Sequence, residues 1–144
     1  MNSLSYGSVS AQDADVIFRL SRELIDRYEN VREIQYDKVL AWVRRKIEQN
    51  LAEYSRIIAD GITVGYYRLH PAEGKTELDD FYVLPEYRGR GIGTQVLQTC
   101  IAQTPSPIFL YVFTENTDAI RLYERMGFRI TKSAGSTRYI MERT

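Results

Sequence analysis

The spacing of apolar residues predicts two helices in the first third of the chain. A helix starting near Gln12–Asp13 has apolar residues at helical spacing along one face, namely Ile17, Leu20, Leu24 and Tyr28. A second helix, about Tyr36 to Leu51, has a similar apolar side formed by Tyr36, Leu40, Val43, Ile47 and Leu51. The charged positions between them predict a solvated outer face. Residues 4 to 9 before these helices could form an edge strand.

The period then changes to that of strands. The apolar runs Tyr54–Ala59 and Ile62–Leu69 flank Asp60-Gly61, a dipeptide typical of a tight β-hairpin. A turn over Pro71–Gly74 leads to a strand that ends at Leu84.

The second half alternates helix and strand and closes with a strand pair. The predicted segments are a helix from Thr94 to about Gln103, a strand Ile108–Phe113, a helix from about Thr117 to Met126 that ends at Gly127, and strands Phe128–Thr131 and Arg138–Met141. The resulting order, βααβββαβαββ, indicates an α/β fold with a mixed sheet. The length of 144 residues predicts one domain, residues 1–144, and no repeat or linker interrupts it.

The composition argues against several classes of function and predicts a compartment. The 19 basic and 19 acidic side chains give a formal net charge of zero, so no basic surface argues for nucleic acid or an anionic membrane. A single cysteine, Cys100, cannot form an internal disulfide, which fits a reducing compartment. No apolar stretch reaches the ~18 residues of a membrane span, and Met1-Asn2-Ser3 does not resemble a signal peptide. We therefore expect a cytoplasmic protein.

The most informative segment is a glycine-rich turn between a strand and a helix. The apolar strand Leu78–Leu84 runs into Pro85 and then into Gly89, Gly91 and Gly93. Glycine lets the backbone adopt positive φ and lets a ligand approach closely. The unpaired N–H groups and the dipole of a helix N-terminus favour an anion. This segment therefore predicts a phosphate site suited to a pyrophosphate.

The spacing of the glycines excludes two common nucleotide motifs. A P-loop requires Lys-Ser/Thr after its last glycine, but Thr94 follows Gly93 directly. A dinucleotide fingerprint beginning at Gly91 requires a third glycine where Val96 stands. The remaining pattern is Arg88-x-x-Gly91-x-Gly93 after a strand.

That pattern, with its lead-in Val-Leu-Pro-Glu-Tyr-Arg-Gly over 83–89, resembles the acetyl-CoA motif of the GNAT N-acetyltransferase superfamily. A downstream segment is similar to the family's Asn-x-x-Ala-x-x-x-Tyr-x-x-x-Gly-Phe pattern, through Asn116, Ala119, Tyr123, Gly127 and Phe128. The two motifs together cover roughly residues 77 to 130. The N-terminal half matches only in its order of elements.

The resemblance implies a fold and an activity. In this family the first half of the sheet is antiparallel, and the fourth and fifth strands, here Leu78–Leu84 and Ile108–Phe113, are parallel and splayed apart. The implied activity is direct transfer of an acetyl group from acetyl-CoA, without a metal, to a primary amine of a small molecule or peptide. Two alternatives stay open: a CoA-binding module without catalysis, and the same fold with another acyl donor. Homodimers are common in the family and are an open expectation here.

The resemblance also assigns cofactor contacts. Backbone N–H groups would bind the pyrophosphate from Arg88, Gly89, Arg90, Gly91, Ile92, Gly93 and Thr94. The backbone of Phe81 and Val83 would pair with the pantetheine arm, and N–H groups near Val83 would meet the oxyanion. Asn116 would bond the pantetheine; its alternative role is to cap the helix that follows it.

The catalytic candidates are a tyrosine and a group of acids. Tyr123 is expected to protonate the leaving thiolate, since a phenol with a pKa of about 10 keeps its proton at neutral pH; the alternative is a packing aromatic. Asp79 and Asp80 are base candidates, with Asp79 ranked slightly first and Glu77 third. Side chains alternate along a strand, so only one of the pair should face the cleft unless a bulge intervenes. The alternative is an exposed strand edge or a pairing with the N-terminal helices.

The remaining candidates are expected to be structural. His70 is interpreted as a surface residue in a turn before Pro71, and Cys100 as a core residue. No His, Cys and carboxylate residues occur at metal-ligand spacing, so no metal site is expected. The acceptor amine is not specified by any motif. Acidic residues Glu29, Glu33, Asp79 and Asp80 give only a weak indication of a cationic amine such as a polyamine.

Overall fold

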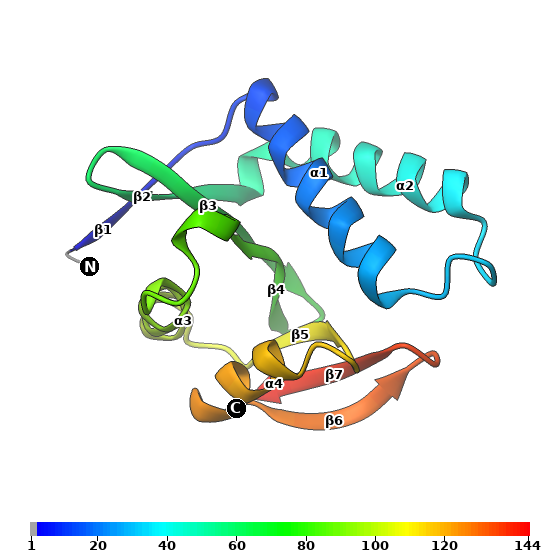
Figure 1. Ribbon diagram of the computed structural model, residues 1–144. Helices are drawn as coiled ribbons and strands as arrows, with labels where there is room; N and C mark the ends of the chain where they lie inside the picture. Colours follow the sequence, from blue (N-terminus) through cyan, green and yellow to red (C-terminus); the bar gives the residue numbers. More distant parts are fainter. Residues whose placement is uncertain (1–2) are drawn as a thin grey trace.

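A computed structural model describes residues 3–144 of the chain (Figure 1). The elements in chain order are β1 (Leu4–Gly7), α1 (Ala11–Tyr28), α2 (Tyr36–Gln49), β2 (Tyr54–Ala59), β3 (Ile62–Ala72), β4 (Lys75–Val83), α3 (Ile92–Gln103), β5 (Ile108–Phe113), α4 (Thr117–Arg125), β6 (Arg129–Ala134) and β7 (Arg138–Arg143). Short 3-10 turns, Leu51–Glu53 and Pro85–Tyr87, precede β2 and follow β4. The predicted βααβββαβαββ order is confirmed.

The strands form one mixed sheet in the order β1-β2-β3-β4-β5-β7-β6. All neighbouring pairs are antiparallel except β4 and β5, which are parallel. The β4–β5 pairing covers only Thr76↔Ile108 and Glu77↔Phe109 within the described chain, and the strands diverge beyond it. The predicted splay of the parallel pair is therefore present.

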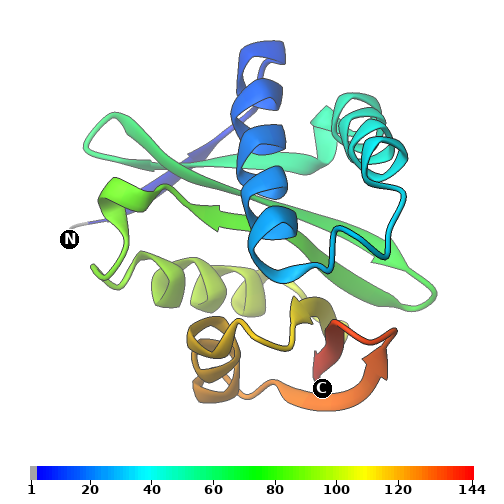
Figure 2. The ribbon, with the colours of Figure 1, turned by 45° about the vertical axis from the view of Figure 1, so that its right-hand side comes forward.

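Two pairs of helices cover opposite faces of the sheet (Figures 1 and 2). Helices α1 and α2 pack with Tyr54 and Tyr66 in one core cluster. Helices α3 and α4 pack with the strands in a second cluster, which contains Cys100, Phe128 and Met141 at 0–1% exposure. The prediction that Cys100 is a core residue is confirmed, and burial raises the pKa of its thiol to about 12. Over residues 3–144 no helix has the length and apolarity that a bilayer crossing requires.

Several predicted boundaries were wrong: β4 covers Lys75–Val83 and β6 covers Arg129–Ala134, and two further shifts have a clear cause. Helix α3 begins at Ile92 rather than Thr94, because Gly91 takes the left-handed N-cap position at φ 80° and the buried Ile92 starts the helix. Strand β3 continues through Pro71 to Ala72, and the turn lies at Glu73–Gly74. Pro71 is tolerated in the strand because β2 pairs with β3 only as far as Arg68, so that no ladder bond is needed on that edge.

Candidate active site

The glycine turn and the start of α3 form an open row of backbone donors. Gly89 and Gly91 have φ values of 77° and 80°, which other residues rarely adopt. Within residues 3–144, no protein acceptor receives a hydrogen bond from the N–H groups of residues 89–94. Gly89 and residues 91–94 line a cavity of about 480 Å³, which is also lined by Phe81 and Val83. The turn therefore has the shape and the free donors that an anion requires.

The two arginines of the turn are placed differently. The Nε of Arg88 donates to the carbonyl oxygen of Val83 at 2.9 Å, which fixes the guanidinium at the mouth of the cavity. The guanidinium of Arg90 lies 5.6 Å from the ring centroid of Tyr87.

The divergence of β4 from β5 leaves one edge of β4 open. The N–H of Leu84 bonds Val64 on β3 at 2.8 Å, so its amide faces β3. Since successive strand residues direct their amides to opposite edges, those of Phe81 and Val83 face the open side. An extended ligand could pair there in the manner of another strand.

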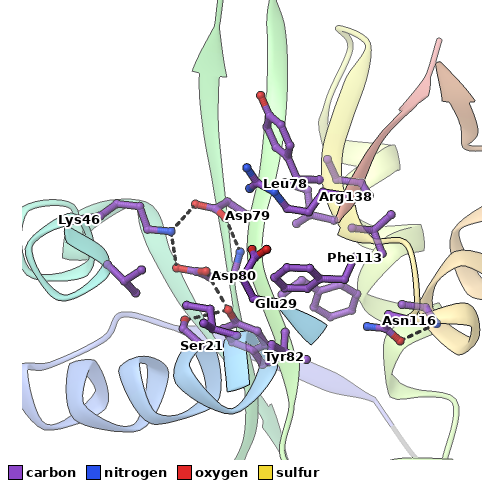
Figure 3. A pocket seen from close by; sticks show the side chains of 18 of the residues that line it. Ser21, Glu29, Lys46, Leu78, Asp79, Asp80, Tyr82, Phe113, Asn116 and Arg138 are labelled. Carbon is purple, nitrogen blue, oxygen red and sulfur yellow. Dashed lines mark hydrogen bonds and ion pairs between the residues drawn. The ribbon is translucent and has the colours of Figure 1, made fainter. Parts of the chain in front are cut away.

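A second cavity, of about 380 Å³, lies between α1, α2 and the diverging strands (Figure 3). It adjoins the first, since both are lined by Phe81, Ala119 and Tyr123. Its far side contains Lys46 and the two adjacent aspartates of β4. A ligand on the glycine turn and a second ligand among the acidic residues would therefore meet beside Tyr123.

Tyr123 lies on α4 at the junction of the two cavities. Its ring packs against Phe128 with centroids 5.8 Å apart, and the residue is only 9% exposed. Burial raises the pKa of the phenol well above its ordinary value, so it keeps its proton at neutral pH. The ring thus packs in the core while it also lines both cavities.

A β-bulge directs Asp79 and Asp80 toward the same cation. The β3–β4 register shifts between Tyr66 and Arg68, and Asp80 has a φ of 46°. As a result Lys46 Nζ lies 3.1 Å from a carboxylate oxygen of each aspartate (Figure 3). The simple alternation that would place only one of them in the cleft does not apply, because the bulge interrupts it.

Gly65 lets β4 approach β3 closely next to the bulge. It pairs with Val83 on β4, and a Cβ at this position would lie 2.2 Å from the carbonyl oxygen of Tyr82. Any side chain would therefore push β4 away from β3 at Tyr82 and Val83, just beyond the bulge.

Asp79 is held by two cations. Its Oδ2 accepts from Lys46 and from Arg68, each at 3.1 Å, and its Oδ1 accepts from the N–H of Asp80 at 2.9 Å. Burial alone would raise the pKa of Asp79, but the charges of Lys46 and Arg68 outweigh it and lower the pKa. This carboxylate is a weak proton acceptor.

Asp80 is more deeply buried, with a side chain only 6% exposed. Its Oδ2 accepts from Tyr54 at 2.5 Å and lies 3.1 Å from Lys46, while its Oδ1 accepts from Tyr82 at 2.9 Å. Burial and the charge of Asp79 raise the pKa of Asp80. Of the two aspartates, Asp80 therefore has the greater affinity for a proton.

Glu77 and His70 form a separate pair. His70 lies in β3 rather than in a turn, its side chain is 17% exposed, and its Nε2 is 3.0 Å from Glu77 Oε1; the interpretation as a surface turn residue was wrong. Their ligand atoms and one of Asp79 lie within 4.8 Å of one another, a cluster that the sequence spacing did not predict. Arg68 and Lys46 already neutralise Asp79 there, so a metal ion would have to compete with two fixed cations.

Asn116 caps α4, which confirms the alternative role predicted for it from the sequence. Its Oδ1 accepts from the N–H of Ala119 at 3.4 Å, and the residue lines the cavity beside Tyr123. Its side-chain amide nitrogen is a further donor available to a ligand.

Several cavity residues were missed from the sequence. They come mainly from the two N-terminal helices and the last hairpin, namely Ser21, Trp42, Lys46, Tyr82 and Arg138, whereas Glu29, also in the lining, was among the acidic residues named from the sequence. The one available signal was Trp42, a large aromatic outside the apolar stripe of its helix, which is 56% exposed. Nothing in the local pattern distinguishes Lys46 from its charged neighbours.

Comparison with known proteins agrees with this geometry. Residues 17–128 match the acetyltransferase (GNAT) family. This chain belongs to that family. The resemblance of its two motifs is thereby confirmed. The matched segment includes α2, the bulged β4, the glycine turn and α4, and so spans both cavities.

Among relatives, the spermine/spermidine N(1)-acetyltransferase of Bacillus subtilis (strain 168) is 34% identical over 83 residues, covering 49% of this chain and 55% of that protein. The mycothiol acetyltransferase of Streptomyces griseus subsp. griseus is 37% identical over 75 residues, covering 48% of this chain and 24% of that protein. The chain thus spans about half the length of the first relative and about a quarter of the second.

Among solved structures, the PaiA N-acetyltransferase of Thermoplasma acidophilum in complex with coenzyme A superposes with a TM-score of 0.74. The sequence identity is 23%, and the match covers 99% of each chain. This likeness shows that the GNAT fold extends over nearly the whole chain.

Proposed function

We propose that this protein is an N-acetyltransferase that moves an acetyl group directly from acetyl-CoA to a primary amine. The observation that carries the proposal is that the two cavities adjoin at Tyr123, one lined by free backbone donors and the other by carboxylates. A transfer reaction in a ternary complex needs such a meeting point.

The cofactor would lie along the glycine turn and the open edge of β4. Backbone N–H groups from Gly89 to Thr94 would bind the pyrophosphate, with Arg88 and Arg90 adding positive charge. The pantetheine arm would pair with the backbone of Phe81 and Val83. The structure of the Thermoplasma PaiA protein, whose fold is similar, contains coenzyme A.

At the reacting atoms three groups have assigned roles. An N–H group near Val83 would stabilise the oxyanion of the tetrahedral intermediate. Tyr123 would protonate the leaving thiolate, and Asp80 would receive the proton of the amine. We favour Asp80 over Asp79 as the base because Asp79 bonds two cations, whereas burial raises the pKa of Asp80.

The acceptor is a small molecule or peptide with a primary amine. The names of two relatives contain spermine and mycothiol, which keeps polyamines and thiol-containing amines among the candidates. In the cavity the charges of Asp79 and Asp80 are paired with Lys46. The carboxylate of Glu29 is then the remaining acidic group of the lining.

The test measures free thiol release from acetyl-CoA with a panel of amines: spermine, spermidine, an aminoglycoside, a lysine peptide and a peptide N-terminus. We expect amine-dependent release with at least one of them and micromolar to millimolar binding of acetyl-CoA by titration calorimetry. Absence of cofactor binding at millimolar concentration would contradict the proposal. Binding without release would indicate a CoA-binding module instead.

A further inference from the structure

Asp80 is poorly placed to take a proton from the amine directly. Its Oδ2 already accepts from Tyr54 and lies beside Lys46, and its Oδ1 accepts from Tyr82. Its side chain is only 6% exposed. Three of its lone-pair positions are thus taken, and this burial leaves an amine in the cavity little direct access to the carboxylate.

A chain of two hydroxyl groups connects Asp80 to the cavity instead. Tyr82 Oη donates to Asp80 Oδ1 at 2.9 Å, and Ser21 Oγ lies 2.8 Å from Tyr82 Oη (Figure 3). Because the phenol proton is directed at the carboxylate, the hydroxyl of Ser21 donates to Tyr82 and keeps its lone pairs for another donor. Ser21 and Tyr82 both line the cavity, although Ser21 is only 5% exposed.

We infer that Ser21 and Tyr82 form a proton relay that carries the acceptor's proton from the cavity to Asp80. The inference rests on the proposed acetyl transfer. Ser21 comes from the middle of α1, far from both sequence motifs, and the relay gives that helix a part in the reaction beyond packing.

The step balances as follows. The amine nitrogen forms a bond to the acetyl carbon of acetyl-CoA, the carbon–sulfur bond breaks, and the thiolate takes the proton of Tyr123. Before this attack the acceptor, an ammonium ion near neutral pH, loses one proton to Ser21 Oγ, while that of Ser21 passes to Tyr82 and that of Tyr82 to Asp80 Oδ1. After the attack the nitrogen loses its second proton to solvent. Asp80 then returns a proton to solvent and Tyr123 regains one. The products are one amide and one free thiol.

The surroundings keep the relay in its working protonation state. Burial and the charge of Asp80 raise the pKa of Tyr82 well above its ordinary value, so the phenol passes protons on without ionising at rest. The charged and titratable groups around Asp80 are Lys46 from α2, Tyr54 from β2, Asp79 and Tyr82 from β4, and Arg68 from β3, which acts through Asp79.

Removing one hydroxyl group at a time tests the relay with little change in side-chain shape. Ser21→Ala and Tyr82→Phe each remove one hydroxyl group. With the amine that the wild type acetylates fastest, we expect kcat/KM at pH 7 to fall at least ~10-fold in each variant. The ratio of wild type to variant should shrink as pH rises toward the amine's own pKa, because solution then supplies the deprotonated amine. Acetyl-CoA affinity should stay within about twofold.

The matched control is Tyr6→Phe. This substitution also removes a partly buried tyrosine hydroxyl, which donates to Thr99 Oγ1 at 3.2 Å. Tyr6 lines neither cavity. The substitution should leave the pH profile unchanged. Unchanged turnover in Ser21→Ala and Tyr82→Phe, or an equal loss at every pH, would overturn the relay. A wild type that acetylates no amine would instead reject the proposed function.

Discussion

The residue whose surroundings most limit its chemistry is Tyr123. It is buried and packed on Phe128, yet it lies where the cavity of the glycine turn meets the acidic cavity. A buried phenol cannot serve as a base at neutral pH, because burial raises its pKa. The acid–base role that we propose for it is therefore donation of a proton to the leaving thiolate.

Removal of this hydroxyl should therefore affect turnover and not binding. We expect Tyr123→Phe to lower kcat at least ~10-fold while the Kd for acetyl-CoA changes less than about twofold. Steady-state kinetics and calorimetry measure the two quantities. Tyr67→Phe, another buried tyrosine of the same core cluster, is the control and should retain full activity. Equal activity of both variants would leave Tyr123 a packing residue only.

At the scale of elements, α2 and the bulge of β4 are joined through a compact charge network. Lys46 on α2 reaches Asp79 and Asp80, while Arg68 on β3 joins Asp79 to Glu53. The side chain of Lys46 is only 16% exposed, so its contacts are screened less than those of surface pairs. This helix is therefore anchored to β4 by charge as well as by its apolar side.

Loss of Lys46 should destabilise the protein in a pH-dependent way. Lys46→Met leaves the two carboxylates with less compensation, at a cost of about 3 kcal/mol near neutral pH. The pKa of Asp80 in the folded state is already raised and would rise further, so its protonated form becomes favourable as pH falls. A carboxylate whose pKa is lowered in the folded state stabilises the fold above its unfolded pKa. Asp79 makes such a contribution, and the variant loses the part of it that comes from Lys46.

We therefore expect the deficit in unfolding free energy of Lys46→Met to be larger at pH 8 than at pH 5 in urea denaturation. Lys38→Met on the exposed part of the same helix should show little change at either pH. A deficit that does not depend on pH would mean that packing, and not charge compensation, explains the effect.

At the scale of the whole molecule, the splay divides the sheet into two parts that meet mainly at one end. β1 to β4 lie on one side, β5 to β7 on the other, and only two residue pairs join β4 to β5 in the described chain. Both cavities lie along this division. A ligand between the strands would add contacts to both parts and should stabilise the folded state.

Acetyl-CoA at about 100 times its Kd should raise Tm by roughly 5–10 °C, from about 2.7 kcal/mol of binding linkage. Differential scanning calorimetry measures the shift. Gly91→Ala, at a φ of 80° in the turn, should lose most of the shift because Ala at this φ strains the donor row. Gly74→Ala has a similar φ of 82° and equally open surroundings, but lies in the β3–β4 turn and should keep the full shift.

Local chemistry explains what the sequence could predict. The Asp60-Gly61 hairpin, the glycine turn, the Asn116 cap and the end of α4 at Gly127 depend on residues close together in the chain. For these features short-range backbone preferences and periodicity decide the conformation. The boundary shifts at Pro71 and Ile92 depended on which sheet edge was free and which side chain reached the core.

The sequence by itself determined the order of elements, the glycine turn and the family to which its two motifs belong. Only the tertiary structure decided that Asp79 and Asp80 both contact Lys46 and that Arg68 donates to Asp79. It also decided that Ser21 is connected to Asp80 by hydrogen bonds through Tyr82. The physical reason is that a one-residue bulge of β4, where the register shifts between Tyr66 and Arg68 of β3, sets the direction of these side chains. Such a bulge arises from pairing between strands, which no local pattern of hydrophobic and polar residues specifies.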